Sequence, residues 1–75
     1  MKRAGTVVGT AQGVAVVRTE SENHPRVGET LVDERLETAG TIVDVFGPVE
    51  RPYLAVSPPE KHRVATLIGE TVYAR

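Results

Sequence analysis

The side chains that could perform acid–base, nucleophilic or metal chemistry are few in this chain of 75 residues. Cysteine is absent, and the two histidines, His24 and His62, lie far apart in the sequence. A structural zinc site needs four ligands, and neither histidine has a second ligand at the usual spacing. We therefore expect two surface histidines, no metal site and no cofactor.

The serines and aspartates give little support for a catalytic site. Ser21 lies in a polar loop and Ser57 at a predicted helix cap, so a Ser–His–Asp arrangement finds no support. Asp33 and Asp44 could face each other across two strands as an acid–base pair. The alternative is that Asp33 is a solvated rim residue and that Asp44 pairs with a cation or with backbone donors. No glycine-rich phosphate loop is present, and we expect no catalytic residues and no enzyme.

The charge balance argues against phosphate binding as the main activity. Nine basic and ten acidic residues give a net charge of −1, whereas domains that bind nucleic acid usually show a basic excess or stripe. A local patch could still form from Lys2, Arg3 and Arg75, so direct RNA binding remains an alternative. A chain this short buries only a marginal core. Because disulfides are absent, stabilisation by association with another chain is favoured.

The N-terminus shows no secretory signal, because Met1, Lys2 and Arg3 run into Gly and Thr rather than into an apolar stretch. No apolar run approaches the roughly 18 residues of a membrane span. We expect a soluble, intracellular chain without a membrane partner.

The elements that must position any site are β-strands, since thirteen valines and eight threonines dominate the composition. The turn signals predict strands over 4–8, 13–19, 30–36, 41–46, 53–56 and 70–75. Gly13 supplies positive φ for a hairpin turn over 10–13. In the strand over 13–19, one face is expected to carry Val14, Val16 and Arg18 and the other Ala15, Val17 and Thr19. Six short strands at this spacing indicate an all-β fold, a closed or nearly closed barrel forming one domain over 1–75.

Finer features follow from the same pattern. Charges on both faces of 30–36 suggest an edge or rim, and 37–40 reads as a turn. In 41–46, Val43 and Val45 are expected on one face, with Ile42 and Phe46 on the other. The run 57–60, Ser-Pro-Pro-Glu, matches a capping box and predicts a short helix over about 59–66, ended by Gly69.

The most constrained segment is 40–56, in which two apolar strands flank a connection stiffened by Gly47, Pro48 and Pro52. Both faces of the first strand are apolar, so one can be core while the other needs a cover. Phe46 and Tyr53 fit either core packing or an interface, where aromatic residues are enriched.

Residues 40–49, Gly-Thr-Ile-Val-Asp-Val-Phe-Gly-Pro-Val, with Pro52-Tyr53 and Val56, resemble the signature of the Gar subunit of H/ACA ribonucleoproteins. These are the RNA-guided pseudouridylation complexes. Supporting positions are Val27-Gly28, Leu31-Val32-Asp33-Glu34, Leu67-Ile68-Gly69 and Tyr73. The resemblance covers nearly the whole chain, closely within 40–56 and loosely elsewhere.

The resemblance implies a six-stranded barrel similar to the second domain of translation elongation factors, without catalytic activity. It implies binding to the catalytic domain of the pseudouridine synthase subunit without contact to the guide RNA, and an influence on substrate loading and product release in rRNA modification. Eukaryotic members carry glycine-arginine-rich tails, and this chain, without them, looks like an archaeal member. We therefore expect a cytoplasmic location. Ser57 departs from the family pattern, because many members carry a basic residue there.

The residues expected to bind the partner come from 43–54, with Phe46, Val49 and Tyr53 as apolar anchors. The full set is Val43, Phe46, Gly47, Pro48, Val49, Pro52, Tyr53 and Leu54. Guide RNA and substrate rRNA would be indirect partners through the complex. An exposed apolar patch also favours weak self-association of the isolated chain.

Overall fold

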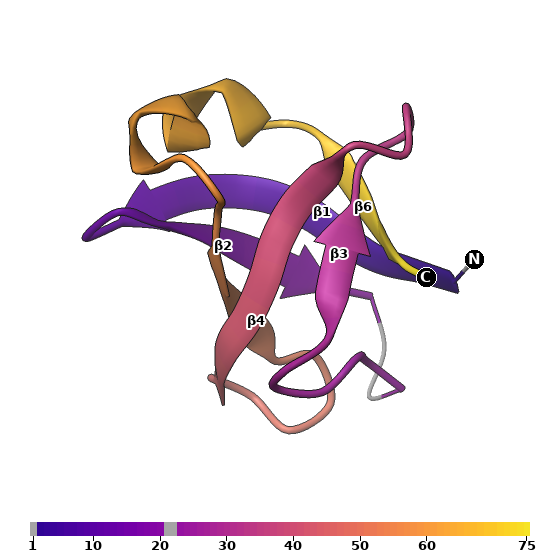
Figure 1. Ribbon diagram of the computed structural model, residues 1–75. Helices are drawn as coiled ribbons and strands as arrows, with labels where there is room; N and C mark the ends of the chain where they lie inside the picture. The colour runs from indigo at the N-terminus through magenta and orange to yellow at the C-terminus, as the bar shows by residue number, and fades with distance from the viewer. Residues whose placement is uncertain (1, 21–22) are drawn as a thin grey trace.

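Six antiparallel strands close into a barrel in the computed structural model, which describes residues 2–20 and 23–75 (Figure 1). The strands are β1 (Lys2–Ala11), β2 (Val14–Thr19), β3 (Thr30–Val32), β4 (Thr38–Phe46), β5 (Tyr53–Ser57) and β6 (Thr71–Ala74). Their order around the barrel is β1-β2-β5-β4-β3-β6. The predicted all-β barrel is confirmed, and closure removes the exposed sheet edges that a small open sheet would carry.

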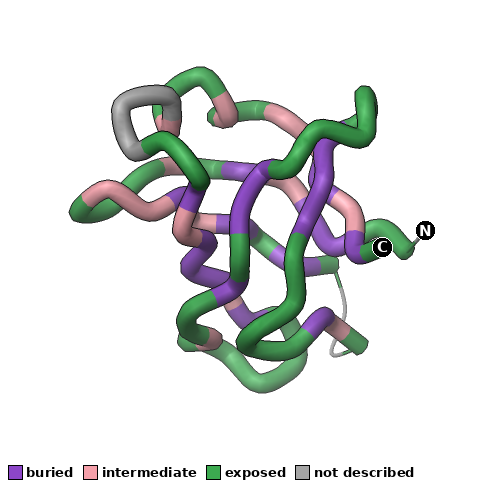
Figure 2. The backbone as a smooth tube through the Cα atoms, in the orientation of Figure 1, coloured by how far each residue is buried: buried purple, intermediate pink, exposed green. Residues whose placement is uncertain are grey.

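The core fills the barrel with aliphatic side chains from every strand. Its main members are Ala4, Val7, Ala15, Val17, Leu31, Ile42, Leu54, Val56 and Val72. Buried and exposed stretches alternate along the strands (Figure 2). Each fully buried valine or leucine contributes about 1.5–3 kcal/mol before the entropy of folding is subtracted. The alternation predicted for β2 is confirmed, because Ala15, Val17 and Thr19 are buried.

The hairpin of β1 and β2 is confirmed, with a tighter turn and a longer first strand than expected. Gln12 and Gly13 both have positive φ, 51° and 82°, as a two-residue turn that matches the strand twist requires. Strand β1 is long because its two neighbours pair with different, only partly overlapping segments of it. Residues 5–11 pair with β2, and residues 2–6 pair with β6.

The predicted strand over 30–36 is wrong beyond Val32, because Asp33 organises a tight turn. The Oδ1 atom of Asp33 accepts the backbone N–H of Arg35 at 2.8 Å and that of Glu37 at 3.0 Å. Leu36 takes φ of 67° in this turn. Asp33 is only 4% exposed, which also corrects its expected solvation. Aspartate often closes turns in this way.

The expected turn over 37–40 is likewise absent, because β4 already begins at Thr38. A β-bulge then sets the faces of β4. Ile42 pairs with Val56 and Asp44 pairs with Ala55, which leaves Val43 as the extra residue. Val45 therefore packs against the core, as Ile42 does. The prediction that Val43 and Val45 share a face is wrong, and Val43 is exposed.

The predicted helix exists as a 3-10 helix, η1 (Lys61–Leu67). The predicted capping box is wrong, because Glu60 occupies the N-cap without a side-chain cap bond while Ser57 ends β5. Val64 and Leu67 pack against the core, and η1 lies at the end of the barrel opposite the 47–52 loop (Figure 1). Gly69 redirects the chain with φ of 92°, as expected. No described helix is long and apolar enough to cross a lipid bilayer.

Candidate protein-docking face

Among the described residues, the two aspartates lie in separate parts of the barrel. Asp33 follows β3 beside the start of β4, whereas Asp44 lies near the other end of β4 and pairs with Ala55. Asp44 Oδ1 accepts the backbone N–H of Val45 at 2.8 Å, which confirms the backbone-donor alternative for this residue. His24 is half-buried, and its Nδ1 lies 2.7 Å from the Pro25 carbonyl oxygen. The His62 side chain lies outside the described residues.

The outer surface of β4, β5, β2 and β1 carries a row of side chains set by strand register. Phe46 pairs with Tyr53, Tyr53 with Arg18, and Arg18 with Thr6. The rings of Phe46 and Tyr53 stack with centroids 5.6 Å apart and planes 24° apart. Because stacking holds each ring against the other, both side chains are ordered before any partner arrives.

A second row on the same surface is mostly apolar. Ala55 pairs with Asp44 on one side and with Val16 on the other. Val8 lies in a bulge of β1 between residues that pair with β2, and its side chain is exposed. The outer apolar face comprises Val8, Val16, Val43, Phe46 and Tyr53. Four strands therefore build one apolar surface on the outside of the barrel.

The sequence predicted Val43, Phe46 and Tyr53 as part of this surface and missed Val8 and Val16. The missed valines come from the first hairpin, which shares no sequence motif with 40–56. The outward alternation of β2 placed Val16 correctly, but only the β2–β5 pairing brings it beside Ala55. The local sequence pattern predicts on which face of the sheet a side chain lies. The order of the strands in the barrel decides which side chains of other strands lie beside it.

The 47–52 loop extends the face beyond the stacked rings. Val49 is 81% exposed, the highest value among the exposed large apolar side chains. Gly47 has φ of 91°, and a Cβ at this position would lie 2.9 Å from Cδ2 of Tyr53. Glycine is required here on both counts, because a side chain would meet the ring and strain the backbone.

Two predicted contact residues are buried. Leu54 is 0% exposed, since Tyr53 points outward and the next residue of a strand points to the opposite face. We therefore correct the expectation that Leu54 contacts a partner: it is a core residue. Pro52 is also buried, and its carbonyl oxygen anchors the loop.

The anchor of the loop is Thr19 at the end of β2. The Pro52 carbonyl oxygen accepts the Thr19 hydroxyl at 2.6 Å and the Thr19 backbone N–H at 3.2 Å. Thr19 is 2% exposed, so water does not compete for these bonds. The tether fixes one end of the 47–52 loop against the neighbouring strand.

Thr19→Val is expected to lower the free energy of unfolding by about 1 kcal/mol, because a buried carbonyl loses its hydroxyl donor while the side chain keeps its shape. Urea unfolding followed by circular dichroism measures this change. Thr10→Val on the exposed end of β1 is the matched control, expected within about 0.5 kcal/mol of the original chain. Equal midpoints for the two variants would contradict a structural role for the tether.

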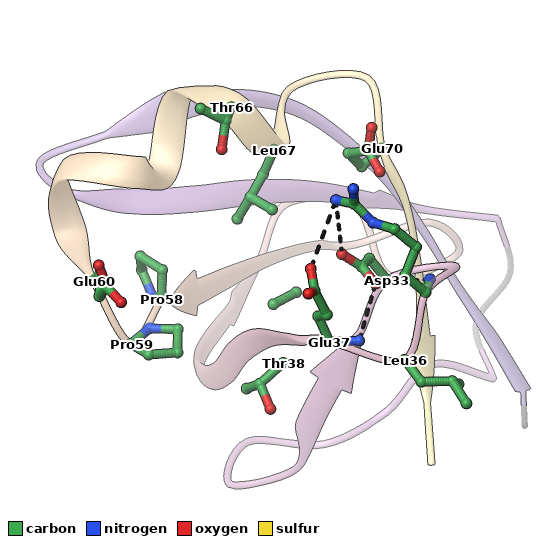
Figure 3. Close-up of a pocket in the computed structure, with 12 residues that line it drawn as sticks. Asp33, Leu36, Glu37, Thr38, Pro58, Pro59, Glu60, Thr66, Leu67 and Glu70 are labelled. Carbon is green, nitrogen blue, oxygen red and sulfur yellow. Dashed lines mark hydrogen bonds and ion pairs between the residues drawn. The ribbon is translucent and has the colours of Figure 1, made fainter.

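A cavity of about 570 Å³ lies between η1 and the turn that follows β3 (Figure 3). Its lining includes Leu36, Pro58 and Leu67. The Arg35 guanidinium lies 3.6 Å from Asp33 and 3.7 Å from Glu37. These ion pairs close the turn internally. Helix η1, which borders the cavity, lies at the other end of the barrel from the 47–52 loop (Figure 1).

The chain is a closed antiparallel β-barrel of six strands with an apolar outer face. The family described as the Gar1/Naf1 RNA binding region matches residues 1–75, so the chain belongs to that family. Among solved structures, it is similar to one titled "Structure of the Gar1 domain of NAf1". That match has a TM-score of 0.73 at 14% identity and covers 99% of this chain and 85% of the other.

Comparison of the sequence with curated proteins finds no match. The structural similarity supports the fold, and the family match supports a role related to H/ACA ribonucleoproteins. The family is a non-catalytic domain associated with ribonucleoproteins.

Proposed function

We propose that this chain is a non-catalytic subunit of an H/ACA guide-RNA pseudouridylation complex and binds the catalytic domain of the pseudouridine synthase. The observation that carries the proposal is the outer apolar face with the exposed Val49 loop at its end. Large exposed apolar surfaces rimmed by polar residues mark sites of protein association. Guide RNA and rRNA would then be reached through the complex.

The geometry of the face suits protein binding. Phe46 and Tyr53 are fixed by stacking, and the 47–52 loop is fixed by Gly47, by two prolines and by the Thr19 tether. A surface ordered in advance loses little conformational entropy when it docks. Binding energy is therefore available for holding the synthase, and we propose that this binding affects substrate loading and product release.

A second candidate is direct RNA binding, which the description of the matched family names. Contact with phosphates needs several converging cations. The two rows that build the outer apolar face include one cation, Arg18, and one anion, Asp44, and the net charge of the chain is −1. Protein docking therefore agrees better with the composition of this face.

The test is to mix the purified chain with the pseudouridine synthase and to measure association by calorimetry, with guide RNA titrated in parallel at two salt concentrations. We expect saturable binding to the synthase and weak binding of the chain alone to RNA. Tight RNA binding that falls steeply with salt, together with no binding to the synthase, would overturn the proposal in favour of the second candidate.

A further inference from the structure

A second cavity, of about 530 Å³, borders the outer apolar face and contains two arginines. Its lining consists of Thr6, Val8, Arg18, Thr19, Glu20 and Arg51. Val8 belongs to the outer apolar face as well, and Arg18 pairs with Tyr53 across β2 and β5. The cavity is therefore continuous with the proposed docking face.

The two arginines reach this cavity from distant parts of the sequence. Arg18 is placed by the register of β2 between β1 and β5. Arg51 is placed by its neighbour, because the Pro52 carbonyl is held by Thr19, the residue that follows Arg18. The same tether that orders the 47–52 loop thus brings the two guanidinium groups to one cavity.

The cations of the cavity lack an internal counter-charge. Its acidic residue, Glu20, already lies 3.1 Å from the Arg3 guanidinium. Neither Arg18 nor Arg51 forms an ion pair with any side chain that the structure describes. Arg35 differs, since two carboxylates flank it in the turn after β3. Two exposed arginines beside an apolar surface therefore leave a positive charge for a ligand to balance.

We propose that Arg18 and Arg51 bind an acidic side chain of the protein partner, placed beside the partner's apolar contacts with the outer apolar face. The inference rests on the proposed function, because it concerns the edge of the same face. Guanidinium groups bind carboxylates through paired, charge-assisted hydrogen bonds. Complementary charge at the border of an apolar interface fixes its orientation and speeds encounter.

A protein carboxylate fits this cavity better than an RNA phosphate. The Val8 side chain forms part of its wall, which suits a ligand carried on an apolar protein surface. Two arginines suffice for one carboxylate, whereas the affinity of RNA rests on many phosphate contacts. The contact between the two arginines and the partner carboxylate would orient the partner so that its apolar side chains lie over Phe46 and Tyr53.

The test is to measure binding of the synthase to Arg18→Glu, Arg51→Glu and the double variant, at low and at physiological salt. We expect each reversal to weaken binding by about tenfold, and the salt dependence to fall in the double variant. Arg75→Glu makes the same charge change at an exposed residue outside the cavity, and its affinity is expected to stay within about threefold of the original.

Each outcome decides between interpretations. If Val49→Asp abolishes binding while the arginine reversals leave it unchanged, the proposed function stands and this inference is wrong. If the reversals weaken binding of guide RNA to the chain but not binding of the synthase, the ligand is a phosphate and the carboxylate is excluded. Restoration of affinity for Arg18→Glu by an acidic-to-arginine change in the synthase would confirm the pairing.

Discussion

Val49→Asp is expected to weaken binding of the chain to the pseudouridine synthase by at least about a hundredfold while leaving the barrel folded. The fold should survive because the Val49 side chain is 81% exposed and belongs to no core contact set. Binding should fail because docking would bury a carboxylate against apolar surface without a partner. That burial costs several kcal/mol, and each 1.4 kcal/mol is about tenfold in affinity.

Calorimetric titration of the synthase measures the affinity, and circular dichroism of the variant checks its fold. Leu36→Asp is the matched control, since Leu36 is 52% exposed and lies in the turn at the other end of the barrel. We expect the control to bind as the original chain does. Wild-type affinity of Val49→Asp would remove the 47–52 loop from the interface, and an unfolded Val49→Asp would show that the loop supports the core.

Gly40→Ala is expected to unfold the barrel or to lower its free energy of unfolding by about 3 kcal/mol or more. A Cβ at this position would overlap the Ser57 carbonyl oxygen and would lie 2.7 Å from Cγ1 of Val56, across the β4–β5 ladder. Overpacking alone costs about 1–3 kcal/mol. Here the clash is with backbone, which cannot rotate away, and the φ of 153° adds strain.

Gly9→Ala provides the matched control, because a Cβ on Gly9 meets no atom within 4 Å and its φ is not positive. It is expected to change stability by less than about 1 kcal/mol. Urea unfolding of the two variants gives the comparison. A small domain has little stability to lose, so even a partial version of the Gly40→Ala effect should appear as a large shift in midpoint. Similar midpoints for both variants would mean that the barrel adjusts around Gly40.

The sequence predicted the hairpin, the six strands and the closed barrel because these follow from local rules. Alternation in β2 sets the facing of Ala15 and Val17, and Gly13 supplies the turn. The motif over 40–49 likewise indicates an apolar surface and a family. Local propensity and a short motif act over neighbouring residues, so one chain is enough to detect them.

The predictions that the structure contradicts, for the strand over 30–36 and for the faces of β4, fail because of interactions that break the regular strand pattern. The strand over 30–36 ended early because the Asp33 carboxylate accepts two backbone N–H groups of its own turn. The faces of β4 were misassigned because a bulge at Val43 shifts every later residue by one position. Side-chain bonds and bulges interrupt the regular period of two, and sequence patterns assume that the period continues.

The sequence by itself determined an all-β chain with an apolar, proline-stiffened connection at 47–52. Only the tertiary structure decided that Leu54 lies inside while Val8 and Val16 join Phe46 and Tyr53 outside. It also decided that Arg18 and Arg51 share one cavity. The physical reason is that the face of the sheet on which a side chain lies is set by alternation along its own strand. The side chains that lie beside it are set by the order in which distant strands pair.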